Sequence, residues 1–289
     1  MSTEAQINRQ NIRGLEFPCS LFFTKAKIEA ALDYSPRDDD VIISTYPKTG
    51  TTWIQYIVYE ILNDGKILPS QSEMSNIVPY MEASGTEILE KLTPPRVLKY
   101  HLPYNMTPHN PKTKYITIIR NPYDVLVSYY HFLRQITNVN LQFDDLFEAF
   151  VTGKCIYGDY FDNILSWYEH KDDDNVLLLS YEKMKKDPRK GLLLISSFLG
   201  YDLQGNEELI QRILNHTSFE YMKANIKTIE KDEGLQNEKK TDGKIHVDFF
   251  RSGKTGDKKQ HFTEAQEKIL SDRIEEKLKG TDVQLLWSF

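Results

Sequence analysis

The stretch Ser44–Trp53, which reads STYPKTGTTW, lies between a short apolar run and a helical pattern. Pro47 sets a turn, Gly50 allows close backbone approach, and the amides of residues 48–52 would point toward a ligand at the positive end of the next helix. That helix is predicted by apolar residues at helical spacing, namely Ile54, Ile57, Val58, Ile61 and Leu62. The stretch therefore predicts a strand, a tight anion-binding loop and a helix.

The polar residues of this loop suit a phosphate. Lys48 supplies a mobile positive charge, and Thr51 and Thr52 offer hydroxyl donors. A nucleoside triphosphatase loop, GxxxxGK followed by Ser or Thr, has its lysine after the second glycine, whereas Lys48 precedes the only glycine of this loop. The residue order therefore argues against an ATPase loop. An ordinary strand-to-helix turn with a threonine cap is the alternative that needs no ligand.

Four short apolar runs, rich in β-branched residues, predict buried parallel strands. They are Val41–Ile43, Arg96–Leu98, Tyr115–Ile119 and Val176–Leu179. Helical patterns alternate with them, so we expect an α/β fold, a single domain with a central parallel sheet flanked by helices and a P-loop-like phosphate-binding loop. Ligands of such sheets bind beyond the carboxyl ends of the strands, which makes the loops after these strands the predicted places for chemistry.

Two later helices and one long loop complete the pattern. The apolar spacing of residues 209–214 predicts a helix, and the capping box Thr263–Gln266 opens an amphipathic one. Residues 223–260 are rich in Lys, Glu, Asp, Gly and Asn and poor in apolar residues, which predicts a long mobile loop. Loops of that length often act as lids over a site.

Composition limits the class of protein. With 289 residues and 40% apolar content the chain can bury a large core. Its formal net charge of −6 argues against a general binder of nucleic acids or acidic membranes. Cys19 and Cys155 belong to no CxxC or Cys/His cluster, so neither a disulfide framework nor a metal site is predicted. The polar start of the sequence and the lack of a membrane-length apolar run predict a soluble, cytoplasmic protein.

The run Lys48–Trp53, KTGTTW, resembles the 5′-phosphosulfate loop of the cytosolic sulfotransferases. The resemblance covers nearly the whole chain, because three further segments match that family in the same order. The second is Leu98–Pro103, LKYHLP, which resembles the family's strand-end pair of lysine and histidine. Alternate side chains of an extended chain project to one side, so Lys99 and His101 would face one reacting centre.

The third segment, Ile119–Phe132, resembles the family's 3′-phosphate segment. Ser128 lies about two helical turns after Arg120, so an arginine fork and a hydroxyl can meet on one phosphate. Trp53 offers a flat face on which adenine can stack. The resemblance implies a donor pocket made of Lys48, Thr49, Gly50, Thr51, Thr52, Trp53, Arg120, Ser128, Tyr181, Thr217, Phe219, Arg251, Ser252 and Gly253.

The fourth segment, Arg251–Lys259, is similar to the family run Arg-Lys-Gly-x-x-Gly-Asp-Trp-Lys. Ser252 stands where the family has lysine and Lys258 where it has tryptophan, so we expect a weaker phosphate grip there. The family's dimer segment also differs, since Glu264 and Lys268 replace its valine and its acid. A monomer or a weak dimer is therefore expected.

The resemblance implies a reaction as well as a pocket. The expected donor is adenosine 3′-phosphate 5′-phosphosulfate (PAPS), which leaves as adenosine 3′,5′-bisphosphate (PAP), and no metal is required. His101 would act as general base toward the acceptor in a direct in-line transfer, while Lys48 and Lys99 stabilise charge on the sulfuryl group. The family further suggests that Ser128 holds Lys48 until transfer begins.

Apolar walls for the acceptor are expected around His101 at Phe22, Phe23, Tyr80, Met81 and Phe132. Such walls favour a small phenol, catechol or aromatic amine, with no nucleic-acid or membrane partner. Two other functions stay open. A P-loop-type small-molecule kinase would need a magnesium-binding hydroxyl with an acidic partner, and a catalytically inactive nucleotide-binding protein would have no need to keep the two lysines and the histidine together.

Overall fold

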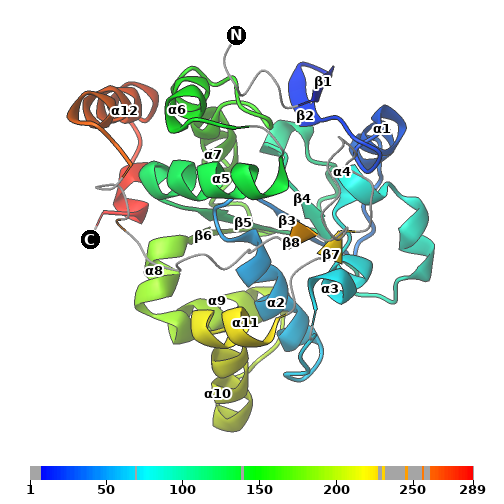
Figure 1. Ribbon diagram of the computed structural model, residues 1–289. Helices are drawn as coiled ribbons and strands as arrows, with labels where there is room; N and C mark the ends of the chain where they lie inside the picture. Colours follow the sequence, from blue (N-terminus) through cyan, green and yellow to red (C-terminus); the bar gives the residue numbers. More distant parts are fainter. Residues whose placement is uncertain are drawn as a thin grey trace.

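The computed structural model describes residues 8–68, 70–137, 140–226, 230–231, 245–246, 256 and 261–288. Its centre is a four-stranded sheet in the order β4-β3-β5-β6, in which every neighbouring pair is parallel (Figure 1). The strands are β3 (Val41–Ser44), β4 (Val97–Tyr100), β5 (Lys114–Ile119) and β6 (Val176–Ser180). The expected α/β fold with a central parallel sheet is confirmed.

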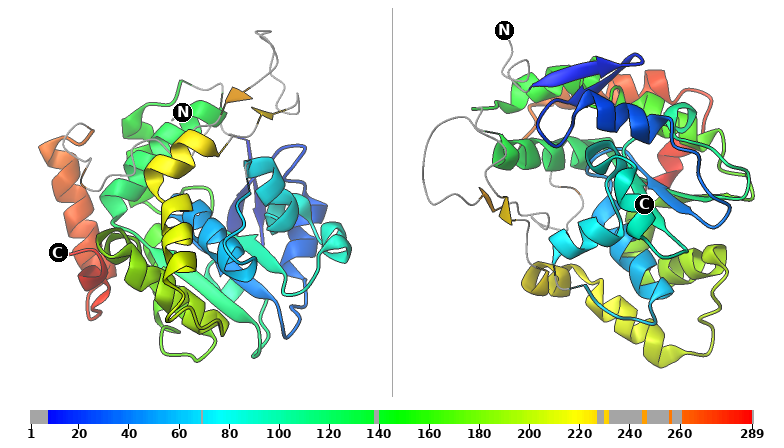
Figure 2. Two further views of the ribbon diagram at one scale, coloured as in Figure 1. Left: turned by 90° about the horizontal axis from the view of Figure 1, so that it is seen from below. Right: turned by 90° about the vertical axis from the view of Figure 1, so that its right-hand side faces the viewer.

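Helices cover both faces of the sheet (Figure 1, Figure 2), because alternate strand residues carry apolar side chains to opposite sides. Ile42 and Leu98 pack into one core cluster, whereas Val41 and Ile43 pack into the other. The first cluster is covered by α1 (Lys25–Leu32), α4 (Met81–Ser84), α5 (Pro122–Ile136), α6 (Phe143–Val151), α7 (Tyr160–Tyr168) and α12 (Glu264–Lys277). The second is covered by α2 (Thr51–Leu62), α3 (Gln71–Ile77), α8 (Tyr181–Lys186), α9 (Pro188–Leu199), α10 (Glu207–His216) and α11 (Phe219–Asn225).

Shorter elements complete the described chain. Two antiparallel pairs are formed, one by β1 (Arg9–Ile12) with β2 (Leu15–Pro18) and one by β7 (Glu230–Lys231) with β8 (Ile245–His246). Single 3-10 turns occur at η2 (Glu87–Lys91), η3 (Tyr104–Met106) and η5 (Val283–Leu286). The prediction of a loop over residues 223–260 is wrong at its start, because residues 223–225 are the end of α11. The same range also contains β7 and β8.

One strand is placed differently from its prediction. β4 begins after Arg96 and continues to Tyr100, rather than ending at Leu98, because Ser44 of β3 pairs with Tyr100 in the parallel ladder. The lysine at position 99 is thereby held inside the strand, and the loop begins at the histidine that follows. Of the two residues expected to act together, Lys99 therefore lies inside β4 and His101 is the first residue after it.

A buried ion pair fixes the start of two central strands. Arg96 is 2% exposed, and its Nε and Nη2 atoms donate to the carboxylate oxygens of Asp40 at 2.8 Å. The hydroxyl of Tyr34 donates to the same carboxylate at 2.6 Å. Both charges are therefore hydrogen-bonded away from water, which is the condition for an ion pair to be tolerated in a core.

Asp40→Ala is expected to lower the free energy of unfolding by about 3–5 kcal/mol, because it leaves a buried guanidinium without its counter-charge. Equilibrium unfolding in urea measures the change. Asp38→Ala is the matched control, since Asp38 pairs with Lys112 at 2.8 Å in a solvent-exposed ion pair, and exposed pairs contribute little. Equal losses in the two variants would contradict the role given to the buried pair.

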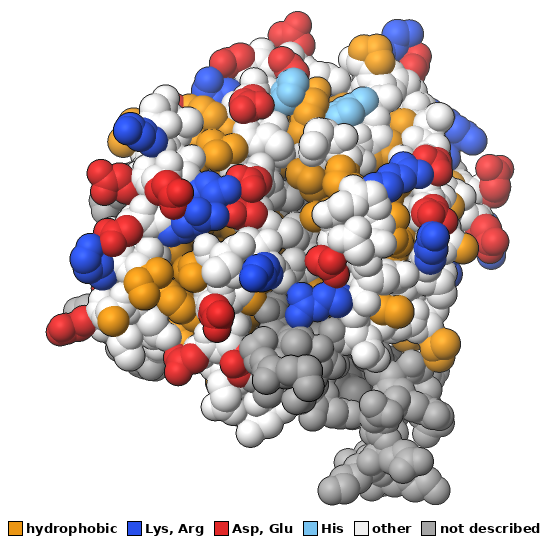
Figure 3. All heavy atoms as spheres, turned by 90° about the horizontal axis from the view of Figure 1, so that it is seen from above, with side chains coloured by type: hydrophobic (Ala, Val, Ile, Leu, Met, Phe, Trp, Pro, Cys, Tyr) orange, Lys and Arg blue, Asp and Glu red, His pale blue; other side chains and the backbone are white. Residues whose placement is uncertain are grey.

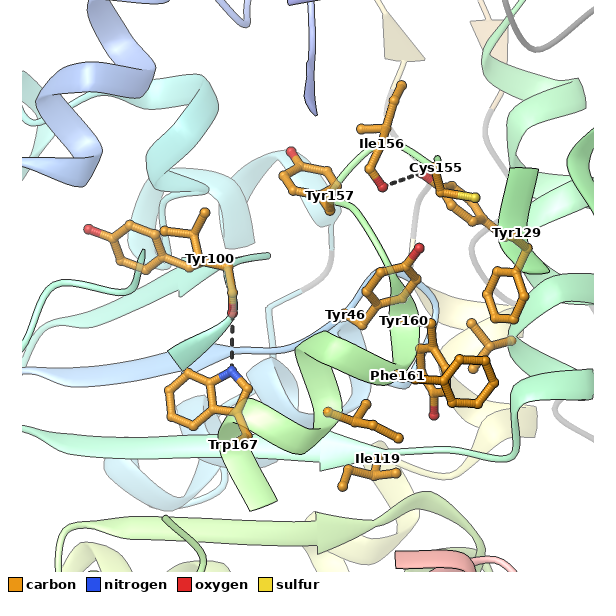
Figure 4. Close-up of a cluster of buried hydrophobic side chains, with 14 of the residues drawn as sticks. Tyr46, Tyr100, Ile119, Tyr129, Cys155, Ile156, Tyr157, Tyr160, Phe161 and Trp167 are labelled. Carbon is orange, nitrogen blue, oxygen red and sulfur yellow. Dashed lines mark hydrogen bonds between the residues drawn. The ribbon is translucent and has the colours of Figure 1, made fainter. Parts of the chain in front are cut away.

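An aromatic core holds the segments that leave β3 and β4 (Figure 4). Tyr46 packs edge-on against Tyr160 with ring centroids 5.1 Å apart. The indole of Trp167 donates to the carbonyl of Leu102 at 3.1 Å. Because these side chains are buried and fixed by packing, the loops beyond the strands are attached to a rigid base.

One face of the described part of the chain carries both signs of charge. Acidic and basic side chains are interspersed over the face seen in Figure 3. None of the helices in the described part of the chain has both the length and the apolar content that crossing a membrane requires. In the segment compared above with the family's dimer segment, Thr263 caps α12 and Lys268 pairs with Asp272 of its own helix at 2.8 Å. The oligomeric state stays a prediction.

Candidate functional site

The loop between β3 and α2 adopts a tight turn. Lys48 and Gly50 have positive backbone φ angles of 70° and 124°, a region that favours glycine. A Cβ atom at Gly50 would stand 3.0 Å from Cδ2 of Tyr181. Glycine is therefore required at position 50 both by the backbone angle and by the closeness of Tyr181. It caps α2, whose first amides form the positive end of a helix.

Threonine hydroxyls of this turn bond within the turn itself. Thr49 donates its hydroxyl to the carbonyl of Tyr46 at 2.8 Å, and the hydroxyls of Thr45 and Thr51 are 2.6 Å apart. Because the hydroxyl proton of Thr49 is already donated, this residue can offer an anion its backbone amide but no hydroxyl donor. Thr52 is partly exposed in the first turn of α2.

Residues expected in the donor pocket meet beside the loop. The guanidinium of Arg120 lies 4.2 Å from the ring centroid of Tyr181 and donates to the backbone carbonyl of Lys48 at 3.2 Å. Tyr181 in turn packs edge-on against Trp53, with ring centroids 5.7 Å apart. The ends of β5 and β6 and the start of α2 therefore bring one guanidinium and two aromatic rings to the anion loop.

Three other expected donor residues lie farther along the helices. Ser128 is partly buried in the second turn of α5. Thr217 and Phe219 lie where α10 meets α11, and the Thr217 hydroxyl donates to the carbonyl of Ile213 at 2.7 Å. Both helices pack into the same core cluster as α2. Thr217 and Phe219 are therefore on the side of the sheet that carries Trp53.

The fourth segment contacts α5, next to Arg120, at one described point. The amide of Gly256 donates to both carboxylate oxygens of Asp124 at 3.1 Å. Asp124 lies 4.0 Å from the guanidinium of Arg120. The segment is thus linked to the donor side through α5. The expected donor residues Arg251, Ser252 and Gly253 lie outside the described residues.

His101 is buried at the carboxyl end of β4, and a hydrogen bond fixes its ring. Nδ1 lies 2.7 Å from the carbonyl oxygen of Thr45, and because a carbonyl can only accept, Nδ1 carries the proton. Nε2 then keeps its lone pair. Burial, and after it the charge of Lys99, lowers the pKa of His101 well below its usual 6.5, although the bond to Thr45 opposes this. The imidazole is therefore neutral, oriented and able to accept a proton.

Two lysines lie near this imidazole, each against an aromatic ring. Nζ of Lys99 lies 3.9 Å from the ring centroid of Tyr80, and that ring packs edge-on against His101 at 5.1 Å. Nζ of Lys48 lies 4.1 Å from the ring centroid of Phe132. Burial lowers the pKa of Lys99 to about 8. A neutral base beside two amino groups at an anion loop suits the movement of an anionic group from a donor to a nucleophile.

The expected acceptor walls differ in their placement. Phe23 packs edge-on against Tyr80 with ring centroids 5.3 Å apart, and Phe132 faces the loop lysine. Phe22 is 45% exposed, whereas Met81 is completely buried in the core. Phe23, Tyr80 and Phe132 are thus assembled next to the candidate base and its lysines.

Three groups at the site are missing from the sequence predictions. Tyr157, with a φ of 69°, packs edge-on against His101 with ring centroids 5.4 Å apart, and its hydroxyl is hydrogen-bonded to that of Tyr80. A carboxylate oxygen of Glu82 accepts the backbone amide of His101 at 2.7 Å. The third group is the carbonyl of Thr45. The apolar run VPYM before Glu82 is a signal that this acid is buried, but no pattern marks the other two.

Comparison with known proteins agrees with this arrangement. The sulfotransferase domain family matches residues 38–282 of the chain. Sulfotransferase 1B1 from Mus musculus is 32% identical over 98% of this chain and 97% of its own length. Amine sulfotransferase from Oryctolagus cuniculus is 36% identical over 96% of this chain and 93% of its own length.

The fold comparison leads to the same family. The crystal structure of mouse sulfotransferase SULT7A1 complexed with PAP has a TM-score of 0.76 and 29% identity, and the match covers 96% of this chain and 97% of that one. The similarity therefore includes the sheet, the loop after β3 and the helices on both faces. This chain is an enzyme of the cytosolic sulfotransferase family.

Proposed function

We propose that this enzyme transfers a sulfuryl group from PAPS to the hydroxyl or amine of a small acceptor. The donor is supported by two features of the site. The loop at Lys48–Thr52 and the guanidinium of Arg120 can each hold one phosphate, and Trp53, which packs against Tyr181, offers a surface for adenine. The relative SULT7A1, solved with PAP, supports the same donor.

In this proposal the reaction is a direct in-line displacement, and each site residue has one role in it. The acceptor oxygen or nitrogen bonds to sulfur as the bond between sulfur and the bridging oxygen of the donor breaks, and PAP leaves. The acceptor's proton passes to Nε2 of His101. Lys48 and Lys99 stabilise charge on the bridging and terminal oxygens of the group in transfer, and Ser128 holds Lys48 before transfer begins.

One observation carries this proposal: Nδ1 of His101 donates to the carbonyl of Thr45. That bond leaves Nε2 as the acceptor of the ring, and the ring of Tyr80 contacts both the imidazole and Nζ of Lys99. A protein that only binds a nucleotide needs no oriented, neutral base next to its anion loop. The geometry therefore favours a catalyst over an inactive nucleotide-binding protein.

We infer that the acceptor is a flat aromatic molecule with a phenol, catechol or amine group. Phe23 and Phe132 are partly buried aromatic residues at the candidate site, and flat aromatic molecules stack well against such walls. The relative named amine sulfotransferase, which is 36% identical, gives reason to test amines as well as phenols. A cytoplasmic location and a lid formed by part of residues 223–260 remain proposals with this function.

Incubation with labelled PAPS, and separately with labelled ATP and magnesium, across a panel of phenols, catechols and aromatic amines tests the proposal. We expect label to move from PAPS to at least one acceptor and PAP to appear in equal amount. Transfer from ATP would support the kinase alternative. Tight binding of PAP without transfer to any acceptor would support an inactive nucleotide-binding protein.

The pH dependence of kcat/KM is expected to reflect two groups of the free enzyme. His101 must be neutral, and because its pKa is lowered, activity is lost only when the pH falls well below 6.5. Lys99 must be charged, so activity is lost as the pH rises through about 8. Initial rates from about pH 4 to about pH 10, which covers the range in which such groups titrate, measure both limbs. An acidic limb above 6.5 would contradict the neutral, buried state of His101.

A further inference from the structure

The segment Pro79–Glu82 runs along the end of β4 and holds it at two points. The amide of Lys99 donates to the carbonyl of Pro79 at 2.9 Å, and Tyr80 forms a parallel bridge with Lys99. Two residues later the amide of His101 donates to Oε1 of Glu82 at 2.7 Å. The backbone of both proposed catalytic residues is therefore positioned by this segment rather than by the sheet alone.

Glu82 is an unusual residue for this place, because it is completely buried. Its second oxygen, Oε2, is also buried and has no hydrogen-bond partner within the described part of the chain. A buried carboxylate is costly unless its charge is balanced. The cation whose charge acts on it is Lys99. The proposed mechanism leaves Glu82 without a role.

We propose that Glu82 is a positioning residue of the active site: its carboxylate fixes the backbone of His101 and supplies the buried counter-charge for Lys99, whose backbone is held by the same segment. This inference rests on the proposed function, because it concerns the two residues assigned to base catalysis and charge stabilisation. Glu82 touches neither donor nor acceptor in this role and acts only through its neighbours.

The electrostatics agree in sign with that role. Burial lowers the pKa of Lys99 to about 8, and the negative charge of Glu82 raises it. Burial raises the pKa of Glu82 to about 7, while the amide of His101 and the charge of Lys99 lower it. Without the carboxylate, Lys99 would therefore lose its proton at a lower pH. A neutral Lys99 could not stabilise charge on a sulfuryl group.

The other titratable groups near Glu82 do not compete for this role. Tyr80, Tyr100 and Tyr157 face it, and burial raises the pKa of each well above 10, so they stay neutral in the working range. His101 is neutral as well, and Lys48 acts on it with the same sign as Lys99. Lys99 is the one group facing Glu82, among the described residues, that changes charge near pH 8.

Glu82→Gln tests the proposal, because the amide oxygen can still accept from the backbone of His101 while the charge is removed. We expect the alkaline limb of kcat/KM for the donor to move to lower pH by about one unit or more, the size of a nearby-charge effect. A second readout needs no catalysis. Acetic anhydride reacts with the neutral form of the Lys99 amine and not with its protonated form. The rate of acetylation of Lys99, measured by mass spectrometry at a series of pH values, therefore gives its titration directly. The same downward shift is expected there.

Glu182→Gln is the matched control. Glu182 is also buried, accepts the backbone amide of Asn121, two residues after the end of β5, at 2.8 Å, and has its pKa raised by burial to about 7. Its cationic neighbour is Arg120, which stays charged at every relevant pH. We expect this variant to leave the titration of Lys99 unmoved, whatever it does to donor binding.

Glu82→Asp keeps the negative charge, and it is the variant to measure if Glu82→Gln does not fold. Its shorter side chain should lose the amide of His101, so kcat should fall while Lys99 titrates as in the unchanged enzyme. An unmoved titration of Lys99 in Glu82→Gln, or an equal shift in Glu182→Gln, would overturn the inference. Absence of sulfuryl transfer in every variant and in the unchanged enzyme would instead refute the proposed function, and the acetylation readout would still decide the role of Glu82.

Discussion

His101→Ala is expected to lower kcat for sulfuryl transfer by about 100-fold to 10,000-fold, the usual contribution of a positioned general base. The imidazole is held by the carbonyl of Thr45 through Nδ1, and burial keeps it neutral at working pH. Its removal leaves the acceptor's proton without a base as the new bond to sulfur forms. Affinity for PAP should change little, because the proposed contact of His101 is with the acceptor. Steady-state kinetics and calorimetric titration with PAP measure the two quantities.

The matched control for this variant is His109→Ala. His109 also places a ring nitrogen 2.7 Å from a backbone carbonyl, that of Tyr104, but it lies beyond the candidate site and is exposed. Its replacement removes a histidine with a similar bond and should leave kcat within a few-fold of the unchanged enzyme. If His101→Ala turned over as fast as His109→Ala, the general base would have to be another group.

The sequence predicts the frame of the molecule well because its signals are local. The runs that become β3, β5 and β6 are continuous and apolar, as strands covered on both faces must be. The capping box at Thr263 is likewise formed as expected. The loop at Lys48–Thr52 is recognised because a lysine, a glycine and threonines occur together between a strand and a helix. None of these inferences depends on a contact between distant residues.

The parts that the sequence could not predict depend on such contacts. β4 extends to Tyr100 because Ser44 of another strand pairs with it, and no local pattern carries that information. Tyr157 reaches His101 through a backbone angle with positive φ, which tyrosine rarely adopts. Glu82 is an acid whose importance comes from what it faces, 19 positions away in the chain. The spacing of residues in the sequence does not reveal which buried groups interact through their charges.

Arg120→Ala is expected to weaken the affinity for PAP, and for PAPS, by about 10-fold to 150-fold, the loss that corresponds to about 1.5–3 kcal/mol for hydrogen bonds to a charged group. The guanidinium stands at the end of β5, over the ring of Tyr181 and 3.2 Å from the carbonyl of Lys48. In our proposal it holds a phosphate that is remote from the transferred group, so KM for the donor should rise far more than kcat falls.

Two further variants separate charge from geometry in this prediction. Arg120→Lys keeps a positive charge but loses the planar fork, so it should recover only part of the lost affinity. Arg189→Ala removes an arginine whose partner is the exposed Glu207, at 2.8 Å, and should leave donor affinity unchanged.

The bond from Arg120 to the carbonyl of Lys48 adds a second expectation, because loss of that bond frees a loop residue held at positive φ. If kcat fell as steeply as the donor KM rose, the arginine would be acting on the geometry of the loop lysine as well as on the remote phosphate. An unchanged affinity for PAP in Arg120→Ala would remove it from the donor grip altogether.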